Sequence, residues 1–151
     1  MKTNRIPISI SALLAIAVLT PTLRAEENHG QKHGHKHTEE TVKVSLPETL
    51  EDLWSAIKLE HAVLLAAVEK KDDHATHDAE EKLQVYLKAL PEKIISLAPT
   101  AQKRIEGQAK NLARVYDSIH HAADDLAWEK ASADLKKAEG ALTLLAAQLP
   151  H

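Results

Sequence analysis

The chain has 151 residues, with 19 Lys and Arg against 22 Asp and Glu, and it contains neither Cys nor Phe. The absence of cysteine excludes disulfides and a lipid-anchored amino-terminal cysteine. The acidic balance disfavours nucleic acid as a partner, since it repels phosphate backbones, and a core limited to Leu, Ile, Val and Ala favours helices over strands.

Residues 1–25 have the three parts of a secretory signal peptide. Lys2 and Arg5 precede an apolar run from Ile8 to Leu19, and Ala25 ends the segment. The run is shorter than the ~20 residues of a spanning helix, so an uncleaved anchor is the weaker alternative. We expect cleavage after Ala25, a location in the periplasm or outside the cell, and no stable membrane span in the exported protein.

The exported chain is expected to form one domain behind a tail. Removing 25 of 151 residues leaves 126, with 16 basic against 22 acidic residues and a net charge of −6. Residues 26–44 are polar and lack an apolar period, which predicts a disordered tail. Its closely spaced imidazoles indicate a flexible metal-binding arm, with a merely solvated leader as the alternative. They belong to His29, His33, His35 and His37.

The first helix is predicted to begin at a capping box. Ser45 and Glu48 have the spacing at which each side chain can accept from the other's amide. Apolar residues then recur every three or four positions until about Lys71. They are Leu50, Leu53, Trp54, Ile57, Leu64, Leu65 and Val68.

A second helix follows a short polar turn, with Asp72 or Asp73 as its cap. Pro91 is expected to stop or kink it, and one more helical turn is expected before Pro99. The apolar stripe of this helix consists of Ala79, Leu83, Tyr86, Leu87 and Leu90.

Pro99 is predicted to open a third helix, because proline suits the first helical position. Asp124 and Asp125 should form the next turn and cap the fourth helix, which ends at Pro150. The third helix presents Ile105, Leu112, Val115, Tyr116 and Ile119, and the fourth presents Trp128, Ala131, Leu135, Ala138, Leu142, Leu145 and Leu149. Four amphipathic helices with short connections predict an all-α, antiparallel up-and-down four-helix bundle over residues 45–149.

This topology places the first and third turns at the same end of the bundle. Within the second helix, His74, His77, Asp78 and Glu81 share one face. Imidazole and carboxylate donors suit Zn(II), Ni(II), Co(II) or Cu(II), and the exported chain offers no sulfur. The alternative is that these residues are caps and solvated side chains. The predicted metal ligands at this end are His74, His77, Asp78, His120, His121 and Asp124.

His61 falls inside the apolar stripe of the first helix, so we expect it to be buried. Glu139 lies at a similar depth on the fourth helix and is its predicted partner. A register-fixing pair is favoured over a metal site or an acid–base pair, because residues 45–149 contain no Glu-x-x-His. The sequence also contains no GXSXG, HEXXH or P-loop motif, and we expect no enzymatic activity.

Two segments, HDAEEKLQVYLKALPEKI and DDLAWEKASADLKKAEGALTLLA, carry a resemblance. Their helical rhythm, behind a His-rich leader, is similar to small secreted helical domains that accompany heavy-metal efflux systems in Gram-negative bacteria. The resemblance spans residues 45–149 loosely and implies a periplasmic role in metal handling, with an efflux or sensor protein of the envelope as partner. It nominates no ligands. A helical protein–protein interaction module with incidental histidines is the alternative.

Overall fold

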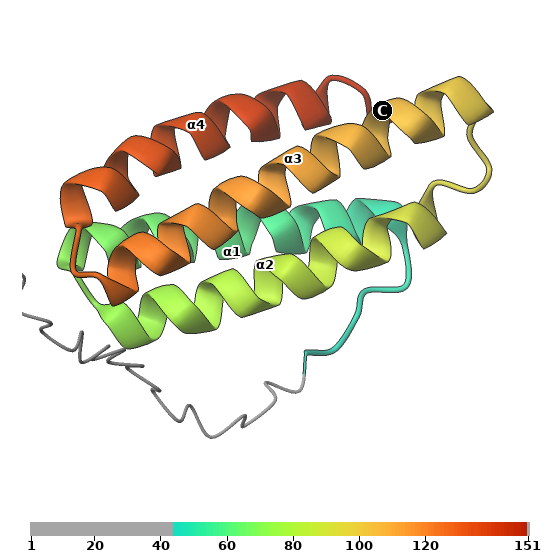
Figure 1. Ribbon diagram of the computed structural model, residues 1–151. Coiled ribbons are helices and arrows are strands. Elements are labelled where there is room, and N and C mark those ends of the chain that lie inside the picture. Colours follow the sequence, from blue (N-terminus) through green and yellow to red (C-terminus); the bar gives the residue numbers. More distant parts are fainter. Residues whose placement is uncertain (1–43, 151) are drawn as a thin grey trace, which may run out of the picture. The chain divides into compact units, whose positions relative to one another are not determined.

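The computed structural model describes residues 44–150, which form four helices. They are α1 (Leu50–Lys70), α2 (Asp73–Lys93), α3 (Pro99–Asp124) and α4 (Trp128–Ala146). Each helix packs against its neighbour in the chain, and Figure 1 shows the α1–α2 and α3–α4 turns at the same end. The predicted up-and-down bundle is confirmed. The predicted signal peptide and residues 26–43 of the predicted tail lie outside the described residues.

The core is built mainly from Leu, Ile, Val and Ala side chains, as the sequence composition predicts. Leu64, Leu83, Leu112 and Leu145 each contribute a fully buried side chain from a different helix. Burial of one such side chain stabilises the fold by about 1.5–3 kcal/mol. Tyr116 of α3 is also fully buried, and it is the largest side chain in this core. No helix within residues 44–150 is long and apolar enough to cross a membrane.

The two turns at the shared end are built alike. Lys71 and Leu126 adopt left-handed backbone conformations, with φ of 56° and 55°. The amide following each of them reaches back to a carbonyl five residues earlier, from Asp72 to Ala67 and from Ala127 to Ala122. This is the Schellman arrangement, which satisfies the last carbonyls of a helix. Both turns are therefore tight, and they hold the start of α2 close to the end of α3.

Several predicted helix ends are corrected. The cap of α1 is Thr49, not Ser45: its hydroxyl accepts from the Asp52 amide at 3.0 Å. Asp124 is the last residue of α3 and Asp125 follows it, so neither caps α4, which begins after Ala127. α4 ends at Ala146, before Pro150.

Other helix ends are as predicted. Asp72 caps α2, accepting from the Ala75 amide at 3.1 Å, and Pro99 opens α3. Pro91, which was expected to stop or kink α2, does not stop it: Pro91 lies in the last turn, and the helix continues to Lys93.

The predicted pairing of buried His61 with Glu139 is wrong. His61 is buried, but its Nδ1 shares a hydrogen bond of 3.0 Å with the Tyr116 hydroxyl, whereas Glu139 is exposed. Burial lowers the pKa of His61, and the nearby charge of Glu139 opposes this only in part. The position of Glu139 along the chain predicts how deep it lies in the bundle, but not that it stands on the exposed side of α4.

Candidate metal site

Three predicted ligands meet at the shared end of the bundle. His77 lies in the second turn of α2, and His120 and Asp124 lie one turn apart at the end of α3. Each offers one ligand atom, and the three atoms lie within 4.8 Å of one another. Because α2 and α3 are antiparallel, residues 47 positions apart in the chain become neighbours.

The three side chains are already in contact. His77 Nε2 lies 2.6 Å from Asp124 Oδ1, and His120 Nε2 lies 3.5 Å from Asp124 Oδ2. The two imidazole rings meet edge to face, with centroids 3.8 Å apart. Donors around a tetrahedral zinc ion at ~2.0–2.1 Å are about 3.3 Å apart. The two separations involve different oxygens of Asp124: the one to Oδ2 is close to this value, and the one to Oδ1 would have to lengthen by less than about an ångström.

The site is partly sheltered and keeps Asp124 ionised. The side chains of His77, His120 and Asp124 are 14%, 23% and 36% exposed. Desolvation raises the pKa of Asp124, but the hydrogen bond from His77 and the charges of His120, His77 and His121 outweigh it. The pKa of Asp124 is therefore lowered, which favours the anionic form that a divalent cation binds.

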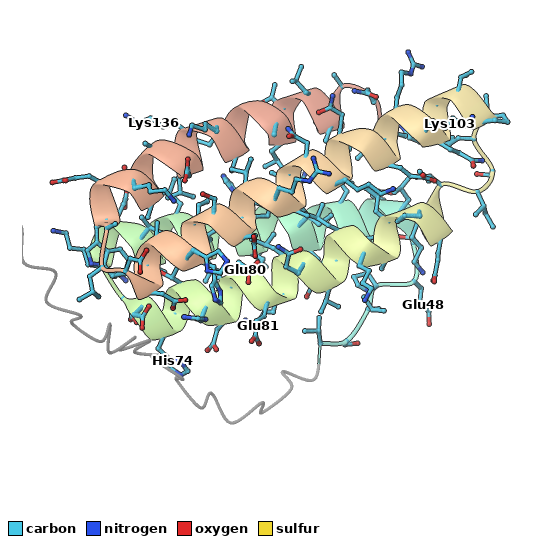
Figure 2. All side chains as sticks on the ribbon, in the orientation of Figure 1. Glu48, His74, Glu80, Glu81, Lys103 and Lys136 are labelled. Atoms are coloured by element: carbon cyan, nitrogen blue, oxygen red, sulfur yellow. The ribbon has the colours of Figure 1, made fainter. Side chains whose placement is uncertain are left out.

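The other predicted ligands at this end lie outside the triad and pair locally. His74 Nε2 lies 3.8 Å from Asp78 Oδ2, and these side chains are 89% and 46% exposed. His121 Nε2 lies 3.7 Å from Asp117 of the same helix, and both are well exposed. Figure 2 shows His74 extending away from the bundle. His29, His33, His35 and His37 lie outside the described residues.

The sequence prediction missed Glu80. This residue is only 5% exposed, and its Oε2 lies 3.3 Å from His120 Nδ1. Figure 2 shows Glu80 between α2 and α3, whereas Glu81 points outward. Glu80 follows His77 by three positions, so the two share a helix face. That spacing was the available signal, but the predicted chelating face joined His77 to Asp78 and Glu81 instead.

No known protein family, curated protein or solved structure matches the chain. Residues 44–150 form a four-helix all-α domain with a candidate metal site of two histidines and one aspartate.

Proposed function

We propose that this protein binds a divalent transition metal ion through His77, His120 and Asp124, and that it buffers or delivers the metal. The observation that carries the proposal is the convergence of three donor atoms, from two helices, within 4.8 Å. Two imidazoles and a carboxylate suit Zn(II), Ni(II), Co(II) or Cu(II), whereas Cu(I) prefers sulfur. The chain has no cysteine.

The number of donors supports a role in exchange. Structural zinc sites usually have four protein ligands, whereas three leave a position for water or an incoming group. Through that position a ligand of another protein could take the ion. We propose a location in the periplasm or outside the cell, a binding rather than enzymatic role, and an efflux or sensor protein of the envelope as the recipient.

The His-rich segment is proposed to capture metal and to raise its concentration near the bundle. The sequence predicts a tail without fixed structure, and closely spaced imidazoles on such a tail would bind ions without a preset geometry, at a cost in ordering the tail. Ions held there would exchange readily. The triad, supported by two helices, is proposed to hold metal more firmly.

Isothermal titration calorimetry on residues 26–151 tests the proposal with Zn(II), Ni(II), Co(II) and Cu(II) near neutral pH. We expect binding that weakens towards pH 5, because imidazole ligands must be deprotonated. Asp124→Asn should remove the bundle site, and His74→Ala is the control for an exposed histidine at the same end. No binding of any of the four ions by the unmodified chain would refute the proposal.

A second set of proteins locates the site. Replacing His29, His33, His35 and His37 with alanine preserves the length of the chain. Metal binding at the bundle site should remain in this variant. If these changes abolish all binding while Asp124→Asn has no effect, the bundle does not bind metal. A free metal concentration one hundred times the dissociation constant should also stabilise the fold by about 2.7 kcal/mol, which is measurable as a rise in the melting temperature.

The alternative role is docking to another protein of the envelope. One observation favours it: Leu59 and Val63, one turn apart on α1, are 68% and 42% exposed. Exposed apolar side chains on one helix face can contribute to a protein interface. Loss of partner binding in a Leu59→Ser, Val63→Ser variant that still binds metal would separate this role from the metal site.

A further inference from the structure

Glu80 carries a buried carboxylate that points towards His120 of the candidate metal site. It is 5% exposed, and a carboxylate removed from water is costly unless it has partners. Its Oε1 accepts a hydrogen bond of 2.6 Å from Gln84 Nε2. The same Gln84 nitrogen donates to the Ala113 carbonyl of α3 at 2.9 Å. The carboxylate is thus fixed between the two helices that carry the ligands.

The second oxygen of Glu80 faces the inner nitrogen of His120. Oε2 lies 3.3 Å from Nδ1, which is closed off from solvent and has no hydrogen-bond partner of good geometry in the described part of the chain. The outer nitrogen of the same ring, Nε2, lies 3.5 Å from Asp124 Oδ2. One imidazole therefore stands between two carboxylates, an inner one that is fixed and an outer one at the surface.

We propose that Glu80 is a positioning residue, which accepts the Nδ1 proton of His120 and so directs the Nε2 lone pair at the metal. This inference rests on the proposed function. Metal-binding histidines usually donate their other ring N–H to a carboxylate, a carbonyl or water, which fixes the tautomer and raises ligand basicity. Glu80 supplies that acceptor, and the metal is held by Nε2 of both histidines and by the Asp124 carboxylate.

Charge supports the same assignment. The two carboxylates, Asp124 and Glu80, together balance a divalent cation, one in contact with it and one across the His120 ring. A metal on Nε2 makes the Nδ1 proton a stronger donor. We therefore expect the 3.3 Å separation to shorten to an ordinary hydrogen bond of about 2.7–3.0 Å when metal binds.

Glu80→Gln tests this role with almost no change in shape. In this variant, the side-chain carbonyl at position 80 would accept the hydrogen bond from Gln84. The N–H₂ group of the same side chain would then face His120 Nδ1. The favoured tautomer then carries its proton on Nε2, where the metal must bind. Removing such a supporting group typically costs 10–100-fold in metal affinity. We expect at least a tenfold loss of Co(II) affinity. Calorimetry and the visible absorption of bound Co(II) both measure this affinity.

Glu81→Gln is the matched control, because Glu81 is the next residue, is exposed, and loses the same charge. Its Co(II) affinity should change less than twofold. If Glu80→Gln binds Co(II) as tightly as the Glu81→Gln control does, the positioning role is wrong. If the unmodified chain binds no Co(II), or if Asp124→Asn leaves binding intact in a chain whose four tail histidines are replaced, the metal site itself fails instead.

A measurement on the unmodified side chains covers the case in which Glu80→Gln does not fold. Nitrogen-15 NMR of histidine in the zinc-loaded protein distinguishes a protonated ring nitrogen from a metal-bound one. We expect His120 to carry its proton on Nδ1 and the metal on Nε2. Metal on Nδ1, or a His120 ring that carries no metal in the zinc-loaded protein, would overturn the assignment.

Discussion

The buried hydrogen bond between His61 and Tyr116 should make the loss of one partner more costly to stability than the loss of both. It joins α1 to α3 across the core at 3.0 Å, between residues 55 apart in the chain. Tyr116→Phe removes the hydroxyl and leaves Nδ1 of a buried imidazole unpaired. His61→Leu removes the imidazole and leaves a buried hydroxyl. Replacing both residues puts two apolar side chains in contact.

The cost of each variant follows from burial. Tyr116 is fully buried and His61 is 8% exposed, so water has little access to the group left behind. An unsatisfied buried polar group costs about 1–3 kcal/mol, which should lower the melting temperature of a domain of this size by roughly 4–12 °C. The double variant should be close to the unmodified protein, because an apolar pair of similar shape is nearly neutral.

Urea unfolding of the four proteins, followed by circular dichroism at pH 7.5 with a chelator present, measures the coupling between the two residues. We expect the loss in the double variant to be smaller than the sum of the single losses by at least about 1 kcal/mol, within the range for residues in contact. Additive losses, agreeing to within about 0.3 kcal/mol, would refute the reasoning. His61→Leu should also leave Co(II) binding unchanged, which would show that His61 serves the core rather than the metal site.

Three further predictions concern pH and helix ends. Burial lowers the pKa of His61 in the folded protein, so as the pH falls through the ordinary histidine pKa of about 6.5 the unfolded chain takes up the proton first. The free energy of unfolding should therefore drop between pH 7 and pH 5, and it should drop less in His61→Leu. Urea unfolding at each pH measures both effects. Thr49→Ala should cost about 1 kcal/mol of unfolding free energy, because it removes the hydroxyl that caps α1, and an unchanged urea midpoint would contradict that role. Leu126→Gly should stabilise the fold by about 1 kcal/mol, since Leu126 has φ of 55° and is 68% exposed; a lower melting temperature would show that its side chain contributes more than its backbone costs.

Helix periodicity in the sequence was sufficient to predict the bundle, but not the start of the first helix. The segment has two possible caps four residues apart, Ser45 and Thr49. A helix begun at Ser45 would include Leu46, which is 48% exposed and adds nothing to the core. From Leu50 onward the apolar side chains pack inward. Thr49 and Asp52 have the same spacing as Ser45 and Glu48, so the local motif fits both positions, and tertiary packing selects Thr49.

The candidate site was predictable only as a neighbourhood. Topology places the start of α2 beside the end of α3, and this was enough to bring His77, His120 and Asp124 together. It could not show that His74 points outward, because both histidines lie off the apolar stripe. Glu80 was missed for a related reason: a carboxylate is normally assigned to the solvent, and only the contacts from Gln84 and His120 explain its burial.

The α1–α2 turn has a consequence for how this protein can vary in length. Asp72 ends one helix with its amide, which donates to Ala67, and begins the next with its side chain, which accepts from Ala75. No spare residue separates the two helices. One residue inserted in this turn would disrupt the cap at the end of α1 or the cap at the start of α2, because Asp72 serves both. Insertions and deletions among relatives should therefore accumulate at the opposite end, in residues 94–98, where the connection between α2 and α3 is longer.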